Sequence, residues 1–301
     1  MTDEPTRIGT ASAGHTDDQS LTFAEKMLRE QARALGRIAQ YLGEQEARRI
    51  LGTIPEPLRL EHWGRKVYSQ TDEDGILGEI LRRIGTGPDG GIVIEFGVED
   101  GLQCNTHWLL RQGFRTVWLE SSDRRAKRIR RLFGDYLTDG RLTLAHELVE
   151  RETVDTRLAA LANGRSVSVL SIDVDGNDYW LWERIESIRP SVVVIEYNAS
   201  VPPPAAVVQH YDPDGPKKVR DDAWGASLSA LHKMGRRKGY ALVGCGIAGV
   251  NAFFVREDLA TDDRFQYART PEALYHPFRR KLIEDAFVPG FRPAAGRDVQ
   301  V

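Results

Sequence analysis

The stretch from Ile92 to Gly101, with the sequence IVIEFGVEDG, constrains the fold of this chain more than any other segment. Four of its first five residues are apolar, which is typical of a short strand buried in the centre of a parallel sheet. Glu95 interrupts this run, and a buried carboxylate is costly unless donors hydrogen-bond to it. Gly97 and Gly101 then bracket a tight turn before a helix expected over Cys104–Gln112. A strand, a glycine turn and a helix N-terminus together predict a nucleotide-binding site, because bare backbone allows a ligand to approach closely.

The residues of this turn favour one class of nucleotide over another. A dinucleotide fingerprint has the pattern G-x-G-x-x-G, but here Glu99 takes the place of the middle glycine. Glu99 and Asp100 would repel a pyrophosphate, whereas S-adenosylmethionine carries a sulfonium and an ammonium group. Glu120 ends the next expected strand, Thr116–Glu120, where an acid suits hydrogen bonds to ribose hydroxyls in both cofactor classes. We therefore favour S-adenosylmethionine, with a nucleotide-free α/β domain as the alternative.

Bulk properties exclude several other classes of protein. The chain has 301 residues, of which 28% are charged and 41% hydrophobic, an ordinary balance for a globular protein. A formal charge of −3 offers no basic field for nucleic acid or an anionic membrane. No apolar run approaches the ~20 residues of a membrane span. Two cysteines, Cys104 and Cys245, do not indicate a disulfide framework, so we expect a cytoplasmic protein.

The N-terminal region divides into a polar tail and a helix. Residues 1–20 are small and polar, and we expect them to be disordered. Apolar residues at three-and-four spacing over Leu21–Leu42 predict an amphipathic helix of about six turns, within a helical extension over residues 21–60. This helix either packs on its own domain or forms a homodimer with a second copy.

Residues 61–260 alternate between strand and helix patterns, which indicates a doubly wound parallel sheet. We interpret the basic run Asp123–Arg131 as a solvated helix face rather than a nucleic-acid site. The proline-rich connection over residues 199–224 is expected to form a lid, and residues 261–301 a tail that packs on the domain. The remaining expected strands are Leu142–Ala145, Val167–Asp173, Ser191–Tyr197 and a closing hairpin of Tyr240–Cys245 with Val250–Val255.

Acidic side chains follow two of these strands. Asp173 and Asp175 come at the end of the fourth strand, and Glu196 and Asn198 at the end of the fifth. Ligands bind at the carboxyl ends of strands in open α/β sheets, and oxygen ligands suit a hard divalent cation such as Mg²⁺ or Ca²⁺. The alternative is that the two aspartates cap the next helix and hold the amino group of the cofactor.

Several segments, taken in order, resemble the FkbM-like group of S-adenosylmethionine-dependent methyltransferases. They are KVYSQTDEDGIL, VIEFGVEDGLQCNT, LSIDVDGNDYWLWE, VVVIEYN, GASLSAL and VNAFFVR, and the resemblance covers roughly Arg65 to Tyr275. The resemblance implies the class I methyltransferase fold, a Rossmann-like α/β fold with a mostly parallel seven-stranded sheet. The pair DGNDY and IEYN is also similar to the magnesium-dependent sugar O-methyltransferases of the TylF type, although Glu-Tyr-Asn stands here where those have paired aspartates.

These observations predict an O-methyltransferase that acts on a hydroxyl of a small molecule, either a sugar or a natural-product metabolite, with or without assistance from a divalent metal. A catalytically silent binding or scaffold protein and an NAD-dependent oxidoreductase are the alternatives. The candidate base is Asp175 or His210, and the candidate metal ligands are Asp175, Glu196 and Asn198. The candidate cofactor-binding residues are Gln70, Glu95, Gly97, Gly101, Asn105, Glu120, Ser121, Glu147 and Asp173.

Overall fold

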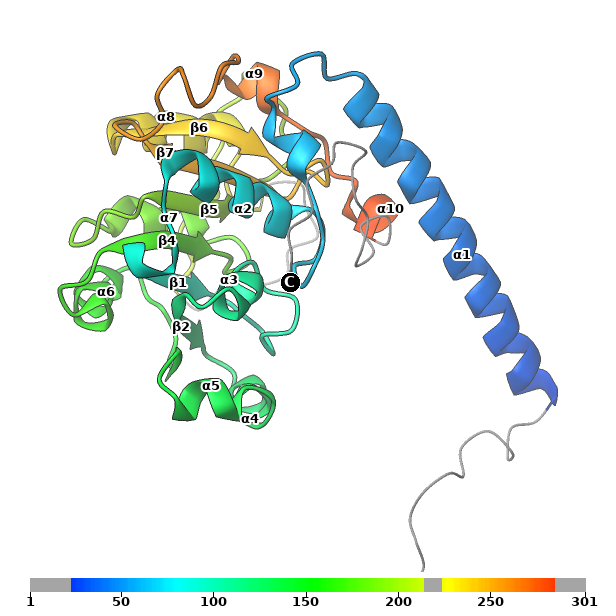
Figure 1. Ribbon diagram of the computed structural model, residues 1–301, viewed down its shortest axis with the longest axis horizontal. Helices are drawn as coiled ribbons and strands as arrows, with labels where there is room; N and C mark the ends of the chain where they lie inside the picture. Colours follow the sequence, from blue (N-terminus) through cyan, green and yellow to red (C-terminus); the bar gives the residue numbers. More distant parts are fainter. Residues whose placement is uncertain (1–22, 214–223, 285–301) are drawn as a thin grey trace, which may run out of the picture. The chain divides into compact units, whose positions relative to one another are not determined.

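The structure is a computed structural model that describes residues 23–213 and 224–284 (Figure 1). The disorder expected for residues 1–20 therefore lies outside the described residues, as does the part of the lid over residues 214–223. The chain divides into a first part, residues 1–39, and a second part, residues 40–301, which contains the sheet. None of the described helices has a stretch long and apolar enough to cross a bilayer.

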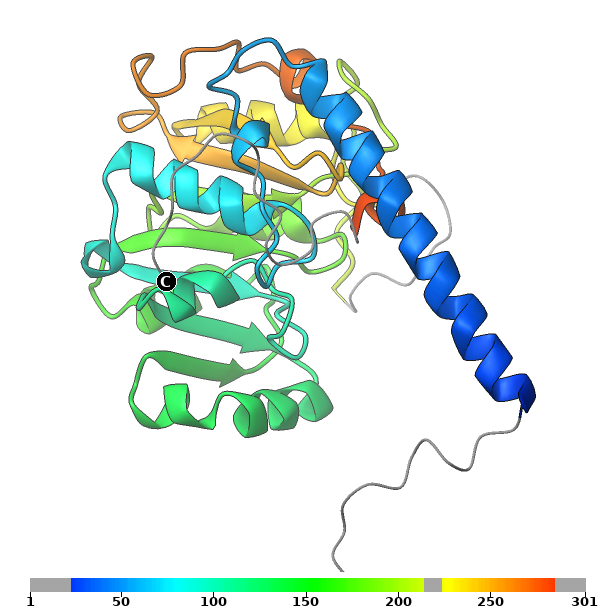
Figure 2. The ribbon, with the colours of Figure 1, turned by 45° about the vertical axis from the view of Figure 1, so that its right-hand side comes forward.

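The described residues form one seven-stranded sheet, with the β6–β7 hairpin at one end and β3 beside α4 and α5 at the other (Figure 2). Its strands, in spatial order, are β3 (Leu142–His146), β2 (Arg115–Glu120), β1 (Ile92–Phe96), β4 (Val167–Ile172), β5 (Val192–Glu196), β7 (Asn251–Arg256) and β6 (Tyr240–Cys245). Strands β1 to β5 pair in parallel, whereas β7 is antiparallel to both β5 and β6. This order and this single reversed strand define the class I methyltransferase fold, as predicted.

Two helical layers cover the sheet because successive strand residues point to opposite faces. Val93 packs on one face and its neighbour Ile94 on the other. One layer contains α2 (Glu73–Ile84), α3 (His107–Arg111) and α4 (Asp123–Leu132). The other contains α6 (Val154–Ala162), α7 (Asp178–Arg184) and α8 (Leu228–Arg237). Burial on both faces explains why β1, β4 and most of β5 are near-continuous apolar runs.

The N-terminal helix α1 (Phe23–Gly52) ends ten residues later than the sequence pattern predicts. Ala47 and Ile50, in its last turns, are buried against Ile247, Val250 and Ile283. These tertiary contacts stabilise helix in a region where the helical apolar periodicity is weak. The end of α1 is therefore part of the sheet-containing part of the chain.

Short elements complete the described chain, and α5 (Gly134–Thr138) among them was not predicted. The others are the 3-10 helices η1 (Leu60–Trp63) and η2 (Pro88–Gly90) and the helices α9 (Pro271–Leu274) and α10 (Arg280–Ile283). Within residues 261–284 the side chains of Phe265, Leu274 and Ile283 are buried, and the packing of the whole segment 261–301 on the domain stays a prediction.

A buried ionic network connects η1 to this C-terminal segment. Both side-chain oxygens of Glu61 accept hydrogen bonds from Arg59, and Oε1 also lies 3.1 Å from Nε2 of His276. Burial by itself would raise the pKa of the Glu61 carboxyl, but the bonds from His276 and Arg59 lower it to about 2. The hydroxyl of Tyr197, one residue beyond β5, donates to the carbonyl oxygen of His276 at 2.6 Å. The segment that follows β5 is thereby fixed to the tail.

Candidate functional site

The glycine turn after β1 lies against the end of β4. Gly97 has a φ of 73°, and a Cβ at this position would lie 1.7 Å from the carbonyl oxygen of Asp173. Gly101 has a φ of 79°, and a Cβ there would lie 2.6 Å from the ring of Trp118. Neither position can hold a side chain without displacing a neighbour. The turn predicted to bind a cofactor is thus in direct contact with the acidic segment after β4.

Glu95 holds the loop that follows this turn. Its carboxylate accepts the backbone N–H groups of Asn105 and Thr106, each at 2.9 Å, and the hydroxyl of Ser171 at 3.1 Å. The side-chain amide of Asn105 donates to the same Ser171 hydroxyl at 3.1 Å. Burial raises the pKa of Glu95, while these hydrogen bonds stabilise its charged form. Hydrogen-bond donors within the protein therefore offset the cost of burying the Glu95 carboxylate. Cofactor binding by Glu95 and Asn105 stays a prediction.

The acids of the turn have arginine partners on α4. Glu99 Oε1 lies 2.7 Å from Arg125 Nη2, and Asp100 Oδ2 lies 3.2 Å from Arg128 Nε. This corrects the electrostatic argument from the sequence, because the paired charges of the turn do not by themselves exclude a pyrophosphate. The basic run on α4 was the feature of the sequence that could have revealed these ion pairs. We interpreted it as a solvated helix face and assigned no partners to its arginines.

Three of the predicted cofactor residues meet at the carboxyl ends of β1, β2 and β3. The backbone N–H of Gly97 donates to Leu119 O at 3.1 Å, and that of Glu147 donates to Glu120 O at 3.2 Å. Glu120 is the last residue of β2 and is 3% exposed, with Oε1 accepting the N–H of Ser122 at 2.7 Å. Ser121 follows it and is exposed. The predicted ribose acid therefore lies at the strand end beside the glycine turn.

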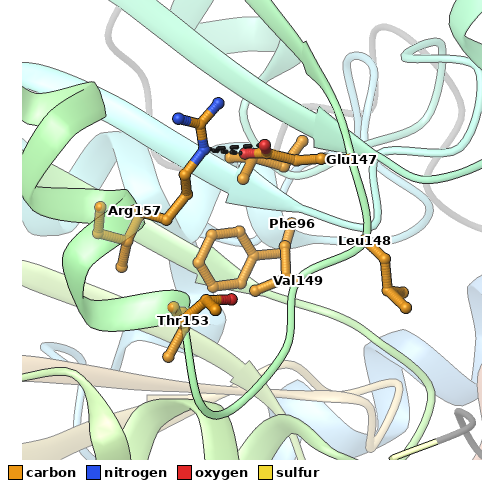
Figure 3. A pocket seen from close by; sticks show the side chains of 9 residues that line it. Phe96, Glu147, Leu148, Val149, Thr153 and Arg157 are labelled. Atoms are coloured by element: carbon orange, nitrogen blue, oxygen red, sulfur yellow. Dashed lines mark hydrogen bonds and ion pairs between the residues drawn. The ribbon is translucent and has the colours of Figure 1, made fainter.

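A small cavity of about 50 Å³ lies next to these strand ends (Figure 3). Its lining residues are Phe96, Leu119, Glu147, Leu148, Val149, Thr153, Val154, Arg157 and Leu158. Glu147 contacts Arg157 Nε through both carboxylate oxygens, at 2.7 and 2.8 Å. The side chain of Leu148 is 58% exposed. The lining is thus mostly apolar, with one charged pair and a partly exposed leucine.

A cluster of three carboxylates occupies the ends of β4 and β5. One oxygen from each of Asp173, Asp175 and Glu196 lies within 4.8 Å of the other two. Desolvation and the neighbouring carboxylates raise the pKa of Asp173 and of Glu196 well above their usual range, although Arg280 lowers both. Asp175 has a φ of 55°, an uncommon conformation outside glycine, so the turn after β4 is unusual at this acid.

The structure differs from the sequence prediction in how Asp173 and Asn198 are used. Asp173, which was assigned to the cofactor, also belongs to the carboxylate cluster. Asn198 is 2% exposed, its Nδ2 donates to Trp224 O at 2.8 Å, and its Oδ1 accepts the N–H of Ser200 at 2.9 Å. The Asn198 side chain thus fixes the start of the lid, and its role as a metal ligand stays a prediction.

Asp178 supports the turn that carries the cluster. Its carboxylate accepts the N–H groups of Val174 at 3.0 Å and Gly176 at 2.8 Å. Burial raises the pKa of Asp178 to about 6, and the two backbone bonds oppose that rise. Asp178 is therefore a positioning residue for Asp175, a function that its place in the DVDGND motif did not reveal.

The described part of the lid is docked on the same turn. Asn177 exchanges two hydrogen bonds with the backbone of Asp212, of 2.7 and 3.2 Å, and Trp180 Nε1 donates to Gln209 O at 2.8 Å. His210 lies between these two anchored residues, and its side chain is exposed. These hydrogen bonds of Asn177 and Trp180 to the segment that we predicted as a lid were not expected from the sequence, although both residues lie in the DGNDYW motif.

Gln70, the last of the predicted residues, is half-buried in the turn that precedes α2. The adjacent amides of Val67, Tyr68 and Ser69 all donate to Asp74 Oδ2, at 2.6 to 2.9 Å. This arrangement orders the backbone around Gln70, and a contact between its side chain and the cofactor stays a prediction.

Comparisons with known proteins give fold-level similarity only. No protein-family model and no curated protein matches the sequence. The chain is similar to magnesium protoporphyrin IX methyltransferase from Synechocystis PCC 6803 with bound SAM, at 12% identity over 61% of this chain and 77% of that one, with a TM-score of 0.40. It is also similar to the N-terminal domain of EvdMO1 with SAH bound, at 15% identity over 74% and 95% of the two chains, with a TM-score of 0.40. Cofactor-bound Rv0187 from MTB has 17% identity over 74% and 89%, with a TM-score of 0.39.

Proposed function

We propose that this protein is an S-adenosylmethionine-dependent O-methyltransferase whose acceptor is a hydroxyl group of a small molecule, a sugar or a natural-product metabolite. The observation that carries this proposal is the contact between Gly97 and Asp173. It brings the glycine turn after β1 against the segment that holds the carboxylate cluster. A cofactor seated on the turn and an acceptor bound at the cluster would therefore be neighbours.

The strand ends supply distinct contacts for each part of the cofactor. In this proposal Glu120, at the end of β2, accepts hydrogen bonds from the ribose hydroxyls. The adenine ring is assigned to the mostly apolar cavity beside Glu147, which must widen to admit it. The methionine portion is assigned to the turn at Gly97, with its ammonium group toward the carboxylate of Asp173.

The reaction is a displacement at carbon. A lone pair of the acceptor oxygen attacks the methyl carbon, the carbon–sulfur bond breaks, and S-adenosylhomocysteine leaves with that electron pair. The hydroxyl proton passes to Asp175 or His210 as general base. Most of the rate acceleration comes from alignment of oxygen, carbon and sulfur, which a rigid sheet edge with a docked lid can provide.

The donor set at the cluster also fits a divalent cation. Asp173, Asp175 and Glu196 would hold Mg²⁺ or Ca²⁺, because both ions prefer carboxylate oxygens. The raised pKa values of Asp173 and Glu196 mean that three adjacent negative charges are costly here without a cation. A cation held by these residues would supply Lewis-acid chemistry, which lowers the pKa of a hydroxyl group.

Two other functions use the same fold. A catalytically silent binding or scaffold protein would need the cofactor turn but not the carboxylate cluster. Because three adjacent carboxylates are electrostatically costly, their presence favours a catalytic role. For an NAD-dependent oxidoreductase, Glu99 still replaces the middle glycine of the dinucleotide fingerprint, although its charge is paired with Arg125.

S-adenosylhomocysteine is expected to raise the melting temperature of the protein, and Glu120→Ala is expected to reduce that rise. A ligand at about 100 times its dissociation constant adds about 2.7 kcal/mol of stability, and loss of the ribose contacts weakens binding. Differential scanning fluorimetry with matched S-adenosylhomocysteine and NAD titrations measures both effects. Glu257→Ala, which removes an exposed glutamate after β7, is the matched control and should respond like the wild type. Stabilisation by NAD alone would refute the methyltransferase proposal.

A further inference from the structure

Helix α1 exposes large apolar side chains in the first part of the chain. The exposed fractions are 79% for Phe23, 64% for Leu28, 66% for Leu35 and 54% for Ile38. Single exposed apolar residues are ordinary, but a series of them along one helix marks a surface that a partner covers. The site chemistry described above makes no use of this surface.

The spacing of these residues indicates the kind of partner. Leu28, Leu35 and Leu42 are separated by seven residues each, and Ile38 lies three residues after Leu35. Leu42 continues the pattern and is 51% exposed. Apolar residues at the first and fourth positions of a seven-residue repeat form the seam of a coiled coil, and a strict seven-residue repeat favours left-handed winding of helices around one another.

The positions that flank this seam are mostly uncharged. They hold Met27, Ala32, Ala34, Ala39 and Tyr41, with Glu25 as the one charged flanking residue within residues 23–42, where coiled coils usually carry the charges that select a different partner. Gln31 is a polar residue within the seam itself. The basic side chains of this stretch, Lys26, Arg29, Arg33 and Arg37, all fall at outer positions of the repeat. Two identical helices can therefore approach closely without placing like charges against each other across the seam.

We propose that a second copy of this chain covers this helix face, so that the protein self-associates through residues 23–42 of α1. An anionic membrane is the rival occupant, because the outer positions are basic. Leu28, Leu35 and Leu42 recur at the seven-residue spacing of a coiled-coil seam, and Glu25 beside the seam would be repelled by an anionic surface. These features favour a second copy.

Light scattering of the full chain tests this inference. At tens of micromolar, the wild type is expected to have at least twice the 33.8 kDa mass of one chain. The double variant Leu28→Gln and Leu35→Gln should return the mass to that of one chain, because it removes two seam residues without changing net charge. The matched control, Arg29→Gln and Arg33→Gln at outer positions, should keep the wild-type mass. Glutamine has about the helix propensity of leucine and arginine, so α1 is preserved in both.

Cofactor binding separates failure of this inference from failure of the proposed function, since the helix face is not part of the candidate site. Both double variants should retain the wild-type response to S-adenosylhomocysteine, which also verifies that they fold. A monomeric wild type, or a seam variant with unchanged mass, would overturn the inference. Binding of a monomeric wild type to phosphatidylserine vesicles would identify a membrane as the occupant instead.

Discussion

Gly97→Ala is expected to destabilise the protein and to abolish cofactor binding. An alanine Cβ would lie 1.7 Å from the carbonyl oxygen of Asp173, and the φ of 73° disfavours any L side chain. The left-handed backbone and the overpacking together cost about 2 to 5 kcal/mol. Because the clash is with backbone, relief requires that the turn and the end of β4 move apart. Chemical denaturation measures the loss of stability, and calorimetric titration measures S-adenosylhomocysteine binding.

Gly134→Ala is the matched control for this variant. Gly134 is the first residue of α5, has no positive φ, and a Cβ there would meet no heavy atom within 4 Å. The control should fold and bind like the wild type, with a stability change below about 1 kcal/mol. A Gly97→Ala protein with wild-type stability and binding would show that the turn and β4 are not in close contact.

Asp175→Asn is expected to lower the rate of methyl transfer by about 10²- to 10⁴-fold while leaving S-adenosylhomocysteine binding nearly unchanged. Asparagine keeps the size of the side chain but removes the charge that accepts a proton or holds a cation. The cofactor contacts are assigned instead to the turn and to Glu120. Transfer of labelled methyl groups to a hydroxylated acceptor found by screening sugars gives the rate. Asp139→Asn, a control at an exposed acid before β3, should leave the rate unchanged.

Magnesium titrations of the same variant separate the two roles of Asp175. Asp173 and Glu196 have raised pKa values in the folded state, so their protonation stabilises the folded protein at low pH. This stabilisation is lost as the pH rises from about 4, the usual carboxyl pKa, through the raised folded-state pKa values. Mg²⁺ should therefore stabilise the wild type more at about pH 8 than at about pH 5, and should stabilise Asp175→Asn less. A rate unaffected by exhaustive chelation would remove the metal and leave Asp175 or His210 as the base.

Much of the sheet could be predicted from the sequence because its strands are buried on both faces. The apolar run of β1, interrupted only by Glu95, is visible without any tertiary information, and its observed bounds, Ile92–Phe96, match the prediction. The alternation of strands with helices, followed by a hairpin, likewise predicted a doubly wound, mostly parallel sheet. Helix ends were less accurate: the buried contacts of Ala47 and Ile50 that extend α1 come from residues about two hundred positions away.

The sequence predicted which strands carry the candidate site but not the pairings between its residues. Glu120 and Glu196 end β2 and β5 as expected, and Asp175 lies three residues after the end of β4. The sequence could not show which oxygens of the acids after β4 and β5 lie close together, or that Arg125 pairs with Glu99, because each pairing joins separate elements. The effect of acidic residues at a turn on ligand binding depends on whether basic side chains pair with them. The electrostatic argument against NAD needed correction because the sequence did not show these ion pairs.

The most direct test of the proposed function is a crystal structure of the protein with S-adenosylhomocysteine and Mg²⁺. We expect the ribose hydroxyls to lie within hydrogen-bond distance of the Glu120 carboxylate and the adenine to occupy a widened cavity beside Glu147. We also expect the sulfur to point from the Gly97 turn toward Asp175. S-adenosylhomocysteine bound away from these strand ends, or excluded from them while NAD occupies the glycine turn, would contradict the central claim.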